Sequence, residues 1–479
     1  MNKNNIFFFN ITFLFLSSIS VNAQDTHYWT QQYGTKSSLL GGAAIGGVRD
    51  NSGVYYNPGA IGFINNKNLS ITANAYQLDR IKLIKGGGNG IDLSSSGIQT
   101  MPLIISGLLK AEKHPKHTLG YCMLTKDQFG INTNARYEDS KNLLNDSYAN
   151  GNEDYTDQFN LISSVYEVMA GWAYGYKVSD KLSIGIGNYG SYRSYHSDYN
   201  RNVRVIPTDS NLILQEISTF DRSYSIGLKN VRTIFKLGAA LNLKKWKFGL
   251  TLTSPSINVW GQGSMQSDVT VSNIDYFGDG TLISLTANTR QDKLKTTYKT
   301  PLTIGFGAEY SNDKTTFAFS CEWFDKVKDY TIIKANGGAY LRPAILGIFT
   351  SSDVLKINEE KQSVFNYAIG FEQKITDKYY ASIGFRTNKS YSTVEKLAKI
   401  NLTYTNWDIY HTSFGITKKR EKSDISVAIN YAISAKKDIY QYANLTNSDA
   451  SNFFEGNPEK ASAIFTSFAF MIGYTHRLK

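Results

Sequence analysis

The sequence predicts an all-β fold: a transmembrane antiparallel β-barrel of about 14 strands, with an N-terminal plug inside the lumen. Three observations predict it. An export leader is followed by no apolar run long enough for a membrane helix, many segments alternate between apolar and small residues, and short connections alternate with long ones. Only helices and closed barrels satisfy every backbone group inside a bilayer. We therefore expect the chain to cross a membrane as a closed barrel.

Residues 1–23, MNKNNIFFFNITFLFLSSISVNA, have the pattern of a secretory signal peptide. Lys3 precedes an apolar run from Ile6 to Leu16, and the small-residue exit ends at Ala23. The run is too short to span a bilayer. We expect cleavage after Ala23 and a mature chain in the outer membrane of a Gram-negative bacterium.

The composition fits one large barrel and excludes several other classes. Tyr (32) and Phe (26) are abundant and Pro (8) is scarce, which suits pleated surfaces. The net charge is +11, but the basic residues are scattered singly, which favours an anionic membrane surface over nucleic acid. Neither the two cysteines nor the acidic loop 137–157 has a metal-ligand spacing. We expect no metal, no cofactor and no enzymatic activity.

The alternation has a period of two residues. In the segment 166–176, one face is Tyr, Val, Ala, Trp, Tyr, Tyr and the other is Glu167, Met169 and three small residues. A small or polar second face suits a barrel lumen whose outside meets lipid. The predicted strands are 67–84, 96–111, 117–136, 157–178, 181–207, 219–243, 245–268, 281–311, 313–331, 362–376, 378–393, 402–420, 422–440 and 460–478.

The connections form two sets. The tight set is 113–117, 178–181, 243–247, 311–314, 375–378 and 419–424, and the longer set is 137–156, 208–218, 269–280, 332–361, 394–401 and 441–459. Short periplasmic turns and longer external loops are the asymmetry expected of such barrels. The sequence therefore divides into a signal peptide (1–23), a plug (24–66) and a barrel (67–479).

The plug contains YGTKSSLLGGAAIGGVRDNSGVYYNPGAIGFI, residues 33–64. It is too rich in glycine for a stable helix or strand and too apolar for a solvated linker. This stretch resembles the N-terminal hatch of the FadL outer-membrane transporter family. A Gly/Ala-rich run, an acidic-Asn pair and an Asn-Pro-Ala turn mark that hatch, and here Asp50-Asn51 and Asn57-Pro58-Gly59 occupy these places. FGLTLTSPSINVWGQG (248–263), TPLTIGFGAEY (300–310), FNYAIGFEQKI (365–375) and IGFRTN (383–388) extend the resemblance more weakly.

The resemblance implies a channel for passive uptake of hydrophobic or amphiphilic molecules such as long-chain fatty acids. It implies lumen binding and lateral release near a kink in the third strand, where Gly130 is the candidate. Expected partners are a hydrophobic small molecule, membrane lipid and lipopolysaccharide, but no nucleic acid, and we expect a monomer. The alternative is a non-transporting barrel that serves in secretion or envelope assembly. Nothing in the sequence identifies the substrate.

Two further sets of residues are candidates for ligand binding. Loop 332–361 contains Leu341, Ile345, Leu346, Ile348 and Phe349, and exposed apolar patches tend to be binding surfaces. The loop either captures a hydrophobic substrate or folds over the barrel mouth, and the two readings are compatible.

Strand parity places Arg193, Arg232 and Arg386 in the lumen, where a guanidinium could pair with a carboxylate head group. The alternative, which we favour, is that the inward Glu167, Glu322 and Glu372 satisfy them.

Overall fold

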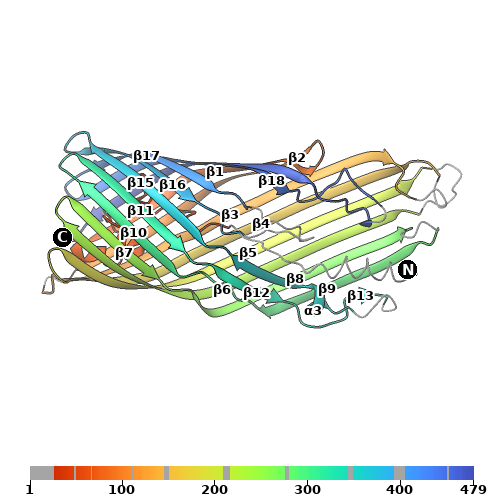
Figure 1. Cartoon of the computed structure of the whole chain (residues 1–479), viewed down its shortest axis with the longest axis horizontal. Coiled ribbons are helices and arrows are strands. Elements are labelled where there is room, and N and C mark those ends of the chain that lie inside the picture. Colours follow the sequence, from red (N-terminus) through yellow and green to blue (C-terminus); the bar gives the residue numbers. More distant parts are fainter. Residues whose placement is uncertain are drawn as a thin grey trace.

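The computed structural model describes residues 26–47, 50–65, 67–110, 113–144, 150–208, 216–275, 280–343, 349–392, 405–449 and 452–478. It is a closed antiparallel barrel of fourteen strands, as predicted (Figure 1). The predicted signal peptide lies outside the described residues. The strands are β1 (Asn68–Gly88), β2 (Ile91–Lys110), β3 (His117–Lys141), β4 (Glu153–Lys177), β5 (Leu182–Pro207), β6 (Ser218–Leu243), β7 (Trp246–Thr253), β8 (Ile257–Ile274), β9 (Ile283–Lys295), β10 (Thr303–Ser311), β11 (Thr315–Phe324), β12 (Val327–Lys334), β13 (Leu341–Arg342), β14 (Lys356–Lys361), β15 (Val364–Lys374), β16 (Tyr379–Asn388), β17 (Ile409–Lys419), β18 (Ser423–Tyr440) and β19 (Lys460–Arg477).

The barrel closes because β1 pairs with both β2 and β19. Two of the fourteen barrel strands are interrupted. β7 and β8 both pair with β6, so together they form one barrel strand. β10 pairs with β7 and β9 pairs with β8, so these two together form the next barrel strand. The sequence predicted each of them as one unbroken strand. The strands on one side of the barrel are short and those on the other side extend much farther (Figure 1).

The predicted ninth strand and the loop after it are also organised differently. β11 ends at Phe324, and β12 leaves the barrel wall to pair with β14 in a separate two-stranded sheet. Helix α3 (Ser351–Val354) precedes β14. The chain leaves the barrel wall because β12 buries Tyr330, Ile332 and Ile333 in an apolar core. In a wall strand, every second side chain would instead point outward.

The outward side chains near the short turns are large and apolar. Exposed examples lie on strands around the barrel: Leu69, Ile71, Leu119, Tyr121, Trp172, Ile184, Leu237, Leu250, Phe306, Phe317, Ile383, Phe414, Val427 and Ile472. Such a band matches the lipid-facing surface of an outer-membrane barrel. Among the described residues, no helix is long and apolar enough to span a membrane.

The N-terminal segment lies inside the barrel, at the end with the short turns. Its short helices are η1 (Ser38–Leu40), α2 (Gly53–Tyr56) and η2 (Ala60–Phe63). η1 contacts β15, β16 and β17, whereas η2 contacts β3, β4, β5 and β6. The segment therefore touches the wall on opposite sides. We call residues 26–64 the hatch.

The other half of the lumen is filled by a large apolar core. Its members come mainly from the long strands β3, β4, β5, β6, β8 and β9, from β12 and β14, and from the connection 441–459, with a few from β1, β2 and β17–β19. The connections at this end therefore fold into the barrel mouth rather than away from it.

Candidate functional site

Asp50 organises the first half of the hatch. Its carboxylate accepts hydrogen bonds from the backbone N–H groups of Lys36 (2.7 Å), Ser37 (3.0 Å) and Ser52 (2.9 Å). It is 5% exposed, so each of these bonds replaces water that burial removed. Asp50 thus joins two turns that lie fourteen residues apart.

Asn51 and Asn57 fasten the hatch to the wall. The Asn51 amide donates to the carbonyl of Ser106 on β2 (3.1 Å). The Asn57 amide donates to the carbonyls of Ile45 (2.9 Å) and Ala239 on β6 (3.1 Å). The sequence singled out both asparagines from the family motif, and the structure gives each a partner in the barrel.

Gly59 has a spatial reason to be glycine where the family motif has alanine. A Cβ atom at this position would lie 2.6 Å from the carbonyl oxygen of Gly238. The neighbouring Pro58 carbonyl packs just as closely against Gly185, where a Cβ would lie 2.4 Å from it. The turn and the inner wall therefore approach each other backbone to backbone.

Three tyrosines of the hatch form a cluster. The rings of Tyr33, Tyr55 and Tyr56 pack against one another at centroid distances of 5.0 to 6.1 Å. Burial raises the pKa of the Tyr33 hydroxyl well above its ordinary value, so it stays protonated. It donates to the carbonyl of Thr125 on β3 (3.0 Å).

Strand β3 is irregular at this point. Its register with β4 shifts between Thr125 and Asp127, and Lys126 is the extra residue of this bulge. The Lys126 ammonium donates to the carbonyl of Tyr28 (2.7 Å) and to the hydroxyl of Tyr55 (3.1 Å) in the hatch. The irregularity lies four positions before Gly130, the predicted kink, which is paired with Ser164 without a shift.

The wall is open beyond this bulge. β2 and β3 pair only where Ile104–Lys110 of β2 lies opposite Thr118–Leu124 of β3. Beyond that ladder, β2 pairs with β1 and β3 pairs with β4. Pro102, which has no N–H to donate, lies at the point where β2 becomes an edge. A recess of ≈ 270 Å³ lies in the gap and is lined by Gly97, Ile98, Gly130 and Ile131, among others.

Side-chain hydrogen bonds cross the gap in place of backbone pairing, and one of them begins a chain that continues onto β1. Gln128 on β3 donates to Gln99 on β2 (2.8 Å), and Gln99 donates to Asp79 on β1 (3.0 Å). Gln77 also donates to Asp79 (3.0 and 3.1 Å) and accepts from Asn74 (2.9 Å). We call these five residues the amide chain. Side-chain bonds of this kind are easier to exchange than a β-ladder.

Arg193 and Arg232 lie in the lumen, as strand parity predicted, and both contact Glu167. The distances from Glu167 oxygens are 2.8 Å to Arg193 Nη1 and 2.5 Å to Arg232 Nη2. Both guanidinium groups also lie over the ring of Tyr298, at 4.6 and 4.5 Å. The structure thus brings Arg193 and Arg232 together with Glu167, one of the three glutamates that the sequence suggested as partners.

Arg386 is different. It is 6% exposed, and it donates to the hatch carbonyls of Trp29 and Thr30 and to His411 Nδ1 (3.0 Å). Among the described residues no carboxylate forms an ion pair with it. Glu322, one of the suggested partners, instead accepts from the indole of Trp29 (2.6 Å).

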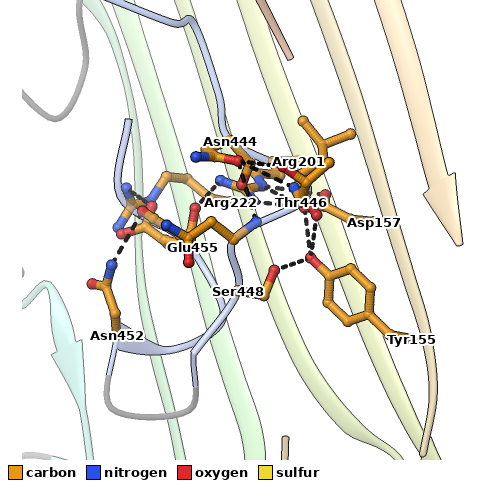
Figure 2. Close-up of polar contacts among 12 residues, drawn as sticks. Tyr155, Asp157, Arg201, Arg222, Asn444, Thr446, Ser448, Asn452 and Glu455 are labelled. Carbon is orange, nitrogen blue, oxygen red and sulfur yellow. Dashed lines mark hydrogen bonds and ion pairs between the residues drawn. The ribbon is translucent and has the colours of Figure 1, made fainter. Parts of the chain in front are cut away.

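The connection 441–459 is held in the mouth by buried ions (Figure 2). Arg201 pairs with Asp157 (2.6 Å) and donates to the carbonyl of Asn444 (2.8 Å), and Arg222 pairs with Glu455. Phe453 and Phe454 have positive φ angles, 49° and 61°, a costly conformation for bulky residues. The ion pairs therefore hold a strained segment in place.

The predicted capture loop lies only partly within the described residues. Ile345, Leu346 and Ile348 are outside them. Leu341 is 3% exposed and belongs to the apolar core, and Phe349 packs against that core. These two side chains pack over the barrel mouth and do not form an exposed surface.

Sequence inspection did not predict the gap, the amide chain or the position of the Tyr298 ring against Arg193 and Arg232. Pro102 was the only local signal of a strand edge. The partners of Gln99 and Gln128 depend on which strands face each other without pairing, and no local pattern reports that.

No family model matches the chain, and no curated protein matches it. Several solved structures match the chain in fold. A Pseudomonas aeruginosa FadL homologue has a TM-score of 0.60 at 14% identity, over 95% of this chain and 100% of that one. The P. putida toluene transporter TodX has a TM-score of 0.57 at 13% identity, over 93% and 99%. The Ralstonia pickettii toluene transporter TbuX has a TM-score of 0.54 at 13% identity, over 94% and 100%.

Proposed function

We propose that this chain, which has the fold of the FadL-type barrels, is an outer-membrane channel for passive uptake of hydrophobic or amphiphilic molecules such as long-chain fatty acids. The observation that carries the proposal is the unpaired wall between β2 and β3, with its recess of ≈ 270 Å³ beside the lumen. A barrel that served only as a scaffold would have no need of such a gap, since unpaired edges are costly in a membrane.

The parts of the barrel suggest a route. The hatch fills the end with the short turns, which would face the periplasm, so a molecule that enters from the other end cannot continue along the axis. The gap offers an apolar molecule a sideways exit into the lipid. Ile98, which lines the recess, is 74% exposed and borders the exit on its lipid side. The amide chain would open for passage and close again afterwards.

The test bridges the gap reversibly. In a variant without native cysteines, Gln99→Cys and Gln128→Cys are joined by a short bifunctional methanethiosulfonate reagent, and uptake of radiolabelled oleate is measured in cells. We expect the bridge to reduce uptake at least tenfold and a reductant to restore it. The control pair Leu109→Cys and Leu119→Cys joins positions already opposite in the β2–β3 ladder.

Equal loss in both pairs would contradict lateral exit, as would unchanged uptake through the bridged gap. An intact barrel that takes up neither oleate nor toluene would favour the alternative, a role in secretion or envelope assembly.

A second measurement concerns the hatch. Deletion of residues 24–64 removes the material that fills the lumen at the short-turn end, so ion conductance in planar bilayers should rise. Unchanged conductance would show that the apolar core in the other half of the lumen closes the pore without the hatch.

A further inference from the structure

A large groove lies on the outer surface of the barrel, near the short turns. Its volume is ≈ 750 Å³, and it extends across β3 to β7. Its apolar lining includes Ile184 on β5, Leu237 and Ala239 on β6, and Leu250 on β7. Ile184, Leu237 and Leu250 are 48%, 49% and 55% exposed, so the groove belongs to the outward apolar band and not to the lumen. We call it the outer groove.

The outer groove exists because a small residue interrupts a row of large ones. Ala239 lies opposite Ile184 in the β5–β6 ladder and opposite Leu250 in the β6–β7 ladder. Side chains that are opposite each other in a ladder lie on the same face of the sheet. The methyl group of Ala239 therefore leaves a depression between two larger side chains, and a hydrocarbon chain can lie in it.

The outer groove runs from the edge of the apolar band toward its middle. Its β3 end is lined by His117, the first residue of that strand, and the His117 ring is hydrogen-bonded through Nδ1 to the Tyr174 hydroxyl. Its β7 end is lined by Leu252, and most of β7 separates this residue from the short turn 243–247. One end is therefore polar and near the membrane surface, and the other end is apolar and deeper.

Positive charge surrounds the polar end. The short turns on either side of β4 contain Lys113, Lys116, Lys177 and Lys181 but only one carboxylate, Asp180, among their described residues 113–117 and 177–181. Lys116 and Lys177 are direct neighbours, since the backbone N–H of Lys177 donates to the Lys116 carbonyl (2.9 Å). Asp180 pairs with Lys177 (2.7 Å). Within these turns, lysines therefore exceed carboxylates by three.

We propose that the outer groove is a binding site for one phospholipid with an anionic head group. One acyl chain lies along Ile184, Ala239 and Leu250, and the phosphate lies among the lysines of the two turns. At about 30 Å³ for each water-sized group, the groove has room for roughly 25 non-hydrogen atoms, which is enough for one acyl chain. The excess of lysines selects a negative head group over a zwitterionic one. The inference does not depend on which molecule the channel transports.

The experiment counts bound lipid by native mass spectrometry. The full barrel in detergent is titrated with phosphatidylglycerol or with phosphatidylcholine of the same acyl chains. We expect the first phosphatidylglycerol molecule to bind at least tenfold more tightly than the first phosphatidylcholine molecule. Each nearby lysine strengthens the attraction to negative charge about fivefold.

The variant that tests the groove itself is Ala239→Phe. Its ring fills the depression, so the tight phosphatidylglycerol site should disappear. Ala170→Phe is the matched control, because Ala170 is an exposed residue of β4 that does not line the outer groove. It should leave the affinity unchanged.

A second pair of variants tests the charge without altering the groove. Lys116→Gln combined with Lys181→Gln should weaken phosphatidylglycerol at least tenfold and leave phosphatidylcholine unchanged. The control is Arg420→Gln combined with Lys422→Gln, two exposed cations in the turn between β17 and β18. This pair lies at the same end of the barrel but away from the outer groove, and it should not change binding of the first lipid.

Three results would overturn the inference. One is equal affinity of the unaltered protein for the two lipids, and another is equal weakening by both charge pairs, which would reduce the effect to a general attraction. The third is a protein dimer that Ala239→Phe converts into monomers, because the outer groove would then hold a second copy of the chain. None of these results would affect the proposed channel function.

Discussion

At the scale of residues, close backbone packing explains the one departure of this hatch from the family motif. The Asn57-Pro58-Gly59 turn lies directly against glycines of β5 and β6. A methyl group at residue 59 has no room, so the glycine reflects contact with the wall rather than an unusual backbone angle, since its φ is −66°.

Replacement of Gly59 by Ala should therefore destabilise the hatch. The added Cβ would lie 2.6 Å from the Gly238 oxygen, and overpacking of this kind costs about 1–3 kcal/mol. Hydrogen exchange of residues 50–64 should accelerate accordingly. Gly97→Ala is the matched control, because a Cβ there meets nothing within 4 Å. Equal exchange rates in the two variants would contradict the packing argument.

Glu167 should be essential for stability. It is 5% exposed and neutralises both Arg193 and Arg232. Glu167→Gln leaves two buried cations with less compensation, and breaking buried pairs costs roughly 3–5 kcal/mol. Guanidinium unfolding in lipid vesicles measures the loss of unfolding free energy.

Glu138→Gln provides the comparison for Glu167. Glu138 pairs with Arg136 in the open, where the two side chains are 61% and 56% exposed, and exposed pairs contribute less than about 1 kcal/mol. A similar loss of unfolding free energy in both variants would mean that the buried pairs of Glu167 with Arg193 and Arg232 are not the source of the effect.

At the scale of elements, the connection 441–459 packs into the barrel mouth, and we call it the lid. Leu445 and Phe454 are fully buried in the apolar core, and the ion pairs of Arg201 and Arg222 secure the segment (Figure 2). A ligand that enters from this end has to displace the lid or pass beside it.

Arg201→Gln should release the lid. Asp157 would lose its bidentate partner and Asn444 its donor, so protease should cleave within 441–459 at least several-fold faster, as followed by mass spectrometry. Arg204→Gln is the control, because Arg204 is 38% exposed and pairs with Asp221 on the outside. Equal cleavage in both would show that the clamp does not hold the lid.

At the scale of the whole molecule, the positive charge gathers at the end with the short turns. Turn sequences such as KVSDK (177–181), LKKWK (243–247) and KKREKSD (418–424) are rich in lysine and arginine. Lys419 lies 3.7 Å from the ring centre of Tyr380, and aromatic residues next to basic ones are typical of a membrane interface. Sequence inspection suggested singly scattered basic residues, because each turn contributes only a few.

This rim should favour anionic lipid. Neutralisation of four basic residues in the last turn (Lys418, Lys419, Arg420 and Lys422 to Gln) should lower the unfolding midpoint in phosphatidylglycerol vesicles but not in phosphatidylcholine vesicles, and salt should reduce the difference. The control neutralises four exposed lysines near β12–β14: Lys326, Lys328, Lys334 and Lys356. A lipid-dependent effect of the same size in the control would contradict a role of the rim.

The sequence by itself determined the barrel, the strand number and the hatch motif. Period-two alternation is local to each strand, and the glycines and asparagines of residues 33–64 stand next to one another in the chain. Parity also placed Arg193, Arg232 and Arg386 correctly in the lumen.

Only the tertiary structure decided the rest. The register between segments far apart in the chain decides which strands lack a paired neighbour. It also decides which carboxylate an arginine contacts and which polar atoms stay unpaired. Asn74 and His411 lie 337 positions apart yet line one cavity, and no local pattern could bring them together. The open wall between β2 and β3 has the same origin: β2 keeps its pairing with β1 and β3 keeps its pairing with β4, and only closure of the barrel leaves their facing edges unpaired.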